Sequence, residues 1–130
     1  MIVGIGVDIV SVERFTRQAR RSPGMLHRVF RDSELVGESG SVLGWPALAA
    51  RFAAKEAAAK ALGASIAFDW HDFSVAPDPA GAAALELSGR GAAEARRLGV
   101  ALWRLSLVHT AGLAFATAIA QAEESVRPGA

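Results

Sequence analysis

The sequence predicts one α+β domain, in which a small antiparallel sheet wraps around a central alanine-rich helix. Residues 46–62 have the strongest helix-forming composition in the chain, because alanine, lysine, glutamate and leucine dominate them. Short β-branched or alternating runs, which are typical of strands, lie on both sides of this segment. A chain of 130 residues has room for one hydrophobic core. We therefore expect a single domain over residues 1–130, with 122–130 as a frayed tail.

The first part of the chain begins with a strand and continues as helices. Residues 2–7 form a β-branched and glycine-containing run that is typical of a buried strand, and this run ends on Asp8. The carboxylate of Asp8 either caps a following turn or is presented into a cleft. Helical spacing follows over 11–31, where Ser22-Pro23-Gly24 divides it into two helices, and 32–35 starts another short helix.

Three arginines of the first helix recur at spacings of three and four residues, namely Arg14, Arg17 and Arg21. This spacing places them on one helical face as a basic stripe. Most charged stripes are simply solvated faces. The alternative is a docking surface for an acidic partner.

The central helix carries the least ordinary charges in the chain. Pro46 suits its first turn, and Gly63 is a natural stop. Glu56 and Lys60 lie four residues apart and so share one face. The only two lysines, Lys55 and Lys60, flank Glu56, whereas every other basic residue is arginine. A compact ammonium suits a phosphate site, although a solvated surface pair would also explain this spacing.

The second half of the chain predicts strands and one more helix. Residues 72–76 and 84–88 predict two strands around a turn at 77–81, and 89–98 predicts a helix. A hairpin follows, and one face of its second strand consists of alanines, which are Ala114, Ala116, Ala118 and Ala120. Because alanine side chains are short, we expect the helix at 46–62 to pack closely against this face.

Composition excludes several classes of protein. A net charge of +1 argues against a general nucleic-acid binder, and the absence of cysteine excludes disulfides and is compatible with the cytoplasm. The N-terminus lacks the features of a secretion signal, and Arg104 and His109 interrupt the apolar run 100–122, so no membrane segment is expected. An apolar fraction of 52% and a mean hydropathy of +0.27 hint at buried subunit contacts.

Two carboxylates on separate elements, Asp8 and Glu56, are the candidate metal ligands. Magnesium is commonly held by one or two carboxylates together with water and substrate phosphates. Zinc would require clustered histidines or cysteines, whereas His27, His71 and His109 are scattered. Mg²⁺ is therefore the metal that these residues suggest.

At these residues the chain resembles a known family. The segments Val3-Gly4-Ile5-Gly6-Val7-Asp8-Ile9-Val10 and Arg51-Phe52-Ala53-Ala54-Lys55-Glu56-Ala57-Ala58-Ala59-Lys60-Ala61-Leu62-Gly63 resemble the holo-acyl-carrier-protein synthases, the small trimeric class of 4′-phosphopantetheinyl transferases. The strand end at Ser106–Thr110 is similar to a third family motif, and the resemblance runs from 2 to about 121. Val108 stands where the family usually has serine or threonine, and no Pro-Arg follows Gly81.

The resemblance implies a transfer of phosphopantetheine from coenzyme A to a serine of an apo-acyl carrier protein, releasing adenosine 3′,5′-bisphosphate. It implies a homotrimer whose active site lies between subunits. Asp8, Glu56 and Lys60 are the candidate catalytic residues. Asp8 and Glu56 would hold Mg²⁺, Lys60 would neutralise phosphate charge, and Glu56 would accept the serine proton.

The remaining candidates bind the two substrates. The candidate coenzyme A contacts are Arg51, Lys55, Lys60, Gly63, Ser65, His109 and Thr110. The acidic acyl carrier protein is expected on the basic stripe of Arg14, Arg17 and Arg21. Two alternatives are a non-enzymatic basic oligomer that binds nucleic acid through its arginines and a coenzyme A binding module without turnover.

Overall fold

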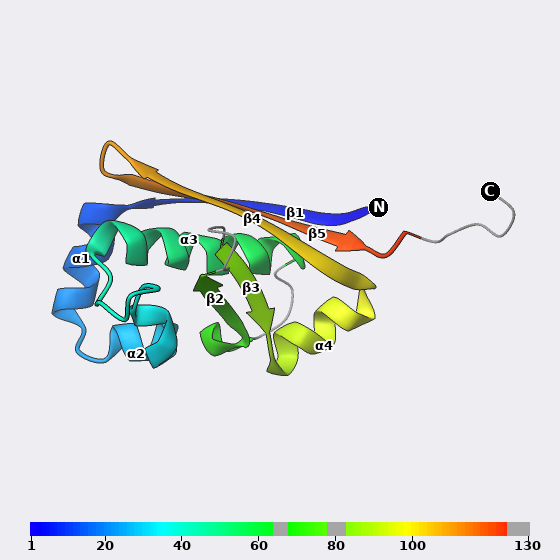
Figure 1. Cartoon of the computed structure of the whole chain (residues 1–130), viewed down its shortest axis with the longest axis horizontal. Helices are drawn as coiled ribbons and strands as arrows, with labels where there is room; N and C mark the ends of the chain where they lie inside the picture. The colour runs from blue at the N-terminus through cyan, green and yellow to red at the C-terminus, as the bar shows by residue number, and fades with distance from the viewer. Residues whose placement is uncertain (64–67, 78–82, 125–130) are drawn as a thin grey trace, which may run out of the picture.

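The fold is organised around helix α3 (Trp45–Ala61), which lies along one face of a three-stranded antiparallel sheet. This computed structural model describes residues 1–63, 68–77 and 83–124. The sheet has the order β1–β5–β4, and its strands are β1 (Ile2–Ser11), β5 (Leu113–Ala122) and β4 (Val100–Thr110). A separate two-stranded sheet, β2 (Phe73–Pro77) and β3 (Ala83–Leu87), lies on the helix side of the first sheet (Figure 1). The α+β prediction is confirmed.

Helix α3 has the predicted position to within one residue at each end. Pro46 lies in its first turn, where the missing N–H needs no partner. Beyond its end, Gly63 adopts a φ of +92°, which is the left-handed conformation that favours glycine. Five alanines of the helix are fully buried, namely Ala49, Ala53, Ala54, Ala57 and Ala58. The helix is therefore a core element that packs on several sides.

Small residues let the sheet approach α3 closely. The alanine face of β5 is at most 1% exposed, which confirms the predicted contact with the helix. On β1, a Cβ atom at Gly4 or Gly6 would collide with the backbone carbonyls of Ala61 or Ala57. These glycines allow the backbone of β1 to lie directly against α3.

Strand β1 is longer than the sequence predicted. It continues beyond Asp8 to Ser11, because β5 supplies antiparallel partners from Ala116, opposite Asp8, to Leu113, opposite Ser11. The prediction that the strand ends at Asp8 was wrong. Ser11 then caps helix α1 (Val12–Arg21), and its Oγ accepts a hydrogen bond from the Arg14 N–H at 3.2 Å.

The outer face of β1 is open in the single chain, contrary to the prediction of a buried strand. The side chains of Ile5, Val7 and Ile9 alternate with the glycines and Asp8, and they are 57%, 52% and 58% exposed. Ile5 pairs with Ile119 and Ile9 with Phe115 on β5, which extends the apolar surface across the sheet. We call the surface of Ile5, Val7, Ile9, Phe115 and Ile119 the outer apolar face.

Short helices complete the fold on the other side of α3, namely α2 (Met25–Val29), η1 (Asp32–Leu35), η2 (Trp70–Asp72) and α4 (Gly89–Arg97). The predicted break between the first two helices is confirmed, and Gly24 has a φ of +85° there. Ala122 is the last residue of β5, so the prediction that it belongs to a frayed tail was wrong. Most of the predicted turn at 77–81 lies outside the described residues. None of the helices in the described part of the chain is long and apolar enough to cross a membrane.

Candidate active site

Asp8, Glu56 and Lys60 meet where β1 crosses α3. Asp8 points from the inner face of β1 towards the helix, and its side chain is only 10% exposed. Glu56 and Lys60 lie one turn apart on α3. The Lys60 ammonium donates to Asp8 Oδ1 at 2.8 Å and to the Val7 carbonyl at 3.1 Å. The structure therefore brings together the three residues that the sequence predicts as catalytic.

The two carboxyl groups perturb each other. The pKa of Glu56 is raised to about 7 by burial and by charge repulsion and hydrogen bonding with the neighbouring Asp8 carboxylate, while Lys60 opposes the shift. The hydrogen bond to Asp8, together with the two negative charges, raises the pKa of Lys60. Because of its perturbed pKa, Glu56 can exchange a proton near neutral pH.

Asp8 also has a buried oxygen available for a cation. With both carboxyl groups ionised, Asp8 Oδ2 accepts no hydrogen bond from the residues that the structure describes. An unsatisfied buried carboxylate oxygen beside a second carboxylate is costly and suits a bound cation. Within the described ranges, no three histidine, cysteine or acidic side chains cluster as metal ligands. The donor set thus fits Mg²⁺, whose remaining ligands would be water and substrate oxygens.

A cleft opens beside these carboxylates, between β1, α1 and α3. It has a volume of about 540 Å³ and is lined by Asp8, Ile9, Val10, Ser11, Arg14, Phe15, Gln18, Phe52, Glu56 and Leu113. Phe15 and Phe52 pack with their ring centroids 5.5 Å apart. Phe15 is a buried core residue that also lines the cleft, and an apolar residue at helical spacing gives no sign of such a position in the sequence.

The basic stripe borders this cleft at one end. Arg14 is a cleft residue, which supports its predicted place near the carboxylates. Arg17 lies 3.7 Å from Glu13 in an exposed ion pair, and Arg21 is exposed at the end of α1. The carrier-protein role of these arginines stays a prediction. Arg31, another arginine of this region, instead binds the His71 carbonyl and Ser74 on the β2 side.

Lys55 does not reach the site, so its predicted contact with coenzyme A is wrong. Its ammonium is fully buried and donates to Glu34 Oε1 at 2.9 Å, to the Trp70 carbonyl at 3.1 Å and to the Phe73 carbonyl at 2.6 Å. These three bonds use all three of its N–H groups. Consecutive helical residues point about 100° apart, so Lys55 faces away when Glu56 faces Asp8.

Of the other candidate coenzyme contacts, Lys60 lies beside the carboxylates, whereas Arg51, His109 and Thr110 make no contact with them in the single chain. Arg51 shares the Lys55 side of α3, and its Nη1 donates to the Glu34 carbonyl at 2.6 Å. His109 and Thr110 are exposed at the end of β4, and β5 separates them from β1. Gly63 lies beyond the end of α3, and Ser65 lies outside the described residues. Val108, a departure from the family pattern, is 53% exposed and pairs with Phe115.

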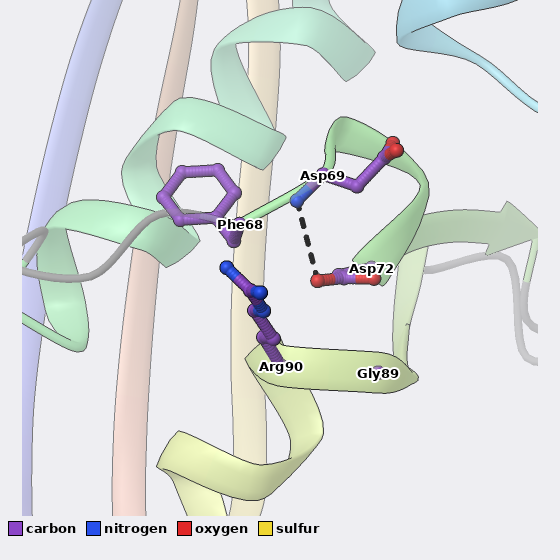
Figure 2. A pocket seen from close by; sticks show the side chains of 5 residues that line it. All are labelled: Phe68, Asp69, Asp72, Gly89 and Arg90. Carbon is purple, nitrogen blue, oxygen red and sulfur yellow. Dashed lines mark hydrogen bonds between the residues drawn. The ribbon is translucent and has the colours of Figure 1, made fainter.

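A second pocket of about 360 Å³ lies where η2 meets α4, and none of the predicted site residues lines it. Figure 2 shows Arg90 directed towards Phe68 and lying beside Asp72, while the Asp69 carboxyl group points away from it. Asp72 Oδ2 accepts the N–H groups of Asp69 and Gly91, each at 3.3 Å. In this place Asp72 ties the start of α4 to η2, which is a structural role.

Comparisons with known proteins identify the family of the chain. A family model of the 4′-phosphopantetheinyl transferase superfamily matches residues 4–118. The chain belongs to this superfamily. A holo-[acyl-carrier-protein] synthase of Salinispora arenicola is 48% identical over 93% of this chain and 99% of that protein. The predicted family is confirmed, and the chain is an enzyme of the phosphopantetheinyl transferase class. The two non-enzymatic alternatives are thereby left without support.

Solved structures of phosphopantetheinyl transferases share the fold. The holo-[acyl-carrier-protein] synthase of Neisseria meningitidis has a TM-score of 0.80 at 29% identity, covering 93% of this chain and 99% of that one. The Helicobacter pylori enzyme, in complex with coenzyme A, has a TM-score of 0.75 at 28% identity, covering 90% of this chain and 99% of that one.

Proposed function

We propose that this transferase uses Mg²⁺ to move 4′-phosphopantetheine from coenzyme A to a serine of an apo-acyl carrier protein, with release of adenosine 3′,5′-bisphosphate. The observation that carries the proposal is the meeting of Asp8, Glu56 and Lys60 at one cleft, with an unsatisfied carboxylate oxygen among them. The names of the curated relatives and the coenzyme A complex of the Helicobacter pylori enzyme support both substrates. The absence of cysteine is compatible with a cytoplasmic enzyme.

The chemistry is a phosphoryl transfer, in which positioning and charge stabilisation dominate. The serine Oγ forms a bond to the phosphorus that carries the pantetheine. The bond from that phosphorus to the bridging pyrophosphate oxygen breaks, and its electrons leave with the adenosine bisphosphate. Mg²⁺ held by Asp8 and Glu56 would stabilise the pyrophosphate charge. Lys60, half exposed at the same place, adds a positive charge for these phosphates.

Glu56 is our candidate for the general base. An acceptor for the serine proton should titrate near the working pH, and the pKa of Glu56 is raised to about 7 by burial and by Asp8. Its carboxylate lines the cleft in which the serine would be placed. It accepts the proton directly or through a water molecule.

The carrier protein docks on Arg14, Arg17 and Arg21 in this proposal. Carrier proteins of this type are acidic, and α1 is basic on its exposed side. Arg14 lines the same cleft as Asp8 and Glu56, so a carrier docked on α1 has its serine directed towards the carboxylates. Exposed ion pairs are individually weak, but they steer the encounter and fix the orientation.

The enzyme is proposed to work as a homotrimer with a shared coenzyme site. The outer apolar face, more than half exposed at Ile5, Val7 and Ile9, is larger than scattered surface residues explain and suits contact between copies. His109 and Thr110, which are exposed on β4 and separated from β1 by β5, are available to the site of a neighbouring copy. Arg51, Gly63 and Ser65 remain candidates for coenzyme contacts.

The proposal is tested by following both products. The enzyme is incubated with coenzyme A, Mg²⁺ and an apo-acyl carrier protein, and a carrier with alanine in place of its modified serine is the control. We expect one adenosine 3′,5′-bisphosphate for each phosphopantetheine attached. Coenzyme A consumption without carrier modification would contradict the proposed reaction.

A further inference from the structure

The buried ion pair of Glu34 and Lys55 has no part in the proposed reaction. Lys55 is fully buried and the Glu34 side chain is 2% exposed, with 2.9 Å between Lys55 Nζ and Glu34 Oε1. Burying two charges is unfavourable unless their geometry and further hydrogen bonds compensate for the lost hydration. Replacing such a pair by apolar residues is often neutral or stabilising for a fold. Stability alone is therefore a weak explanation for this pair.

The pair joins α3 to the open edge of β2. On one side β2 is paired with β3. On the other edge, the Val75 N–H donates to Glu34 Oε2 at 3.0 Å, and the Phe73 carbonyl accepts from Lys55 at 2.6 Å. Glu34 also accepts the Arg31 N–H at 2.9 Å. The two side chains thus satisfy backbone groups that a further strand would otherwise pair.

The alanines of α3 do little to fix the rotation of the helix about its axis. Its buried positions are mostly alanines, and one methyl group resembles another when the helix turns about its axis. A few larger side chains distinguish one side of the helix from the other: Phe52 packs on Phe15, Arg51 donates to the Glu34 carbonyl, and the two lysines bind further polar groups. Lys55 is tied to Glu34 and the β2 edge, and Lys60 is tied to Asp8 on β1.

We propose that Glu34 and Lys55 are positioning residues whose ion pair fixes the rotation of α3, so that Glu56 and Lys60 face Asp8. Lys55 directly precedes Glu56, so a turn of the helix that releases Lys55 also moves the Glu56 carboxyl group away from Asp8. A polar pair specifies this rotation because its hydrogen bonds are directional, whereas apolar contacts with alanine are not. Glu34 thereby acts on the site through Lys55, without touching a substrate.

The test uses the fact that the chain has only two lysines. In Glu34→Gln/Lys55→Met the buried charges are removed together, so no lone charge stays in the core, and Lys60 becomes the single lysine. After labelling with ¹⁵N-lysine, the Lys60 side chain gives one NMR signal, whose position reports its contact with Asp8. Asp8→Asn/Glu34→Gln/Lys55→Met gives the reference for a Lys60 without its ion pair. The control is Glu94→Gln/Arg97→Met, which removes the ion pair of α4.

We expect the Lys60 signal of Glu34→Gln/Lys55→Met to move towards the Asp8→Asn reference. We also expect kcat, measured far below the Tm, to fall at least ~10-fold with a smaller change in the KM for coenzyme A. The α4 control should keep the wild-type signal and kcat. If the double variant does not fold, Glu34→Asp, which keeps both charges but shortens the link, is expected to show the same shift. An unmoved signal or an unchanged kcat in the folded variant overturns the proposal.

This inference rests on the proposed function only for its kcat measurement. The NMR signal needs neither coenzyme A nor a carrier protein. A wild-type enzyme that transfers no phosphopantetheine would defeat the proposed function, while the Lys60 signal would still decide whether the buried pair positions α3.

Discussion

The Lys60 ammonium lies 2.8 Å from Asp8 Oδ1, across the contact between α3 and β1. Glu56, one turn earlier on the same helix, places a second carboxyl group beside Asp8. A cation and two carboxyl groups are thus held at a shared point by elements far apart in the sequence. Gly4 and Gly6 make this possible, because side chains at these positions would push β1 away from the helix.

Loss of either carboxylate should abolish transfer. Asp8→Asn and Glu56→Gln each keep the side-chain volume but remove a proposed metal ligand, and we expect kcat/KM to fall at least ~100-fold. The control is Glu86→Gln, an exposed acidic residue on β3, which should keep wild-type activity. Near wild-type rates for either site variant, with Mg²⁺ in excess, would contradict the assignment.

Glu56 should destabilise the metal-free protein above neutral pH. Its pKa is raised from 4.5 in the unfolded chain to about 7 in the folded one, so the folded state holds more protons between these values. The stabilisation that protonated Glu56 provides is fully present below pH 4.5 and is lost as the pH rises through 7.

Glu56→Gln should therefore have a higher Tm than the wild type at pH 8 in EDTA, and this difference should disappear near pH 4.5. Thermal unfolding across this pH range measures the effect, with Glu86→Gln as the control for a general change in charge. A Tm difference that is independent of pH would show that the Glu56 carboxyl group is not perturbed in this way.

The sequence predicts the helices and strands better than it predicts the candidate site. Helix α3 and the alanine face of β5 are predicted correctly, because composition and alternation over many residues act locally. Which side of α3 faces the site is not determined by local sequence, because it depends on packing against distant parts of the chain. Lys55 and Lys60 have the same chemistry and both flank Glu56, and only packing against β1 and β2 sends one to Asp8 and the other into the core.

Two further misses have similar causes. The end of β1 was misplaced because its continuation depends on pairing with β5, far along the chain. Glu34 was not singled out, because an acidic residue in a short helical segment resembles a surface residue until its partner is known. Glu34 is buried because of its contacts with Lys55 and with Val75 at the edge of β2, and these contacts exist only in the folded structure.

The basic stripe should control the affinity for the carrier protein. Arg14→Glu combined with Arg21→Glu is expected to raise the KM for the carrier strongly, with little change in the KM for coenzyme A. The defect in kcat/KM should narrow as salt rises, because salt screens both the wild-type attraction and the repulsion in the variant. Arg96→Glu, on the exposed side of α4, is the control. A carrier KM equal to that of the wild type would mean that these arginines are only solvated.

The outer apolar face should mediate assembly. Ile5→Glu places a charge opposite Ile119 on this face, and we expect it to convert a trimer into monomers and to abolish activity, because the proposed coenzyme site is shared. Light scattering at micromolar concentration measures the mass. Val42→Glu is the control, since Val42 is an apolar residue that is 81% exposed in a loop. A monomeric and fully active Ile5→Glu would contradict the shared site.

The central claim is that Asp8 and Glu56 support a metal-dependent transfer of phosphopantetheine, and intact-mass spectrometry of the carrier protein tests it most directly. An apo-acyl carrier protein is incubated with coenzyme A and the wild-type enzyme, with Mg²⁺ or with excess EDTA, and in parallel with Glu56→Gln and Mg²⁺. We predict that the carrier gains one phosphopantetheine only with the wild-type enzyme and Mg²⁺. Equal modification in EDTA, or by Glu56→Gln, would contradict the account.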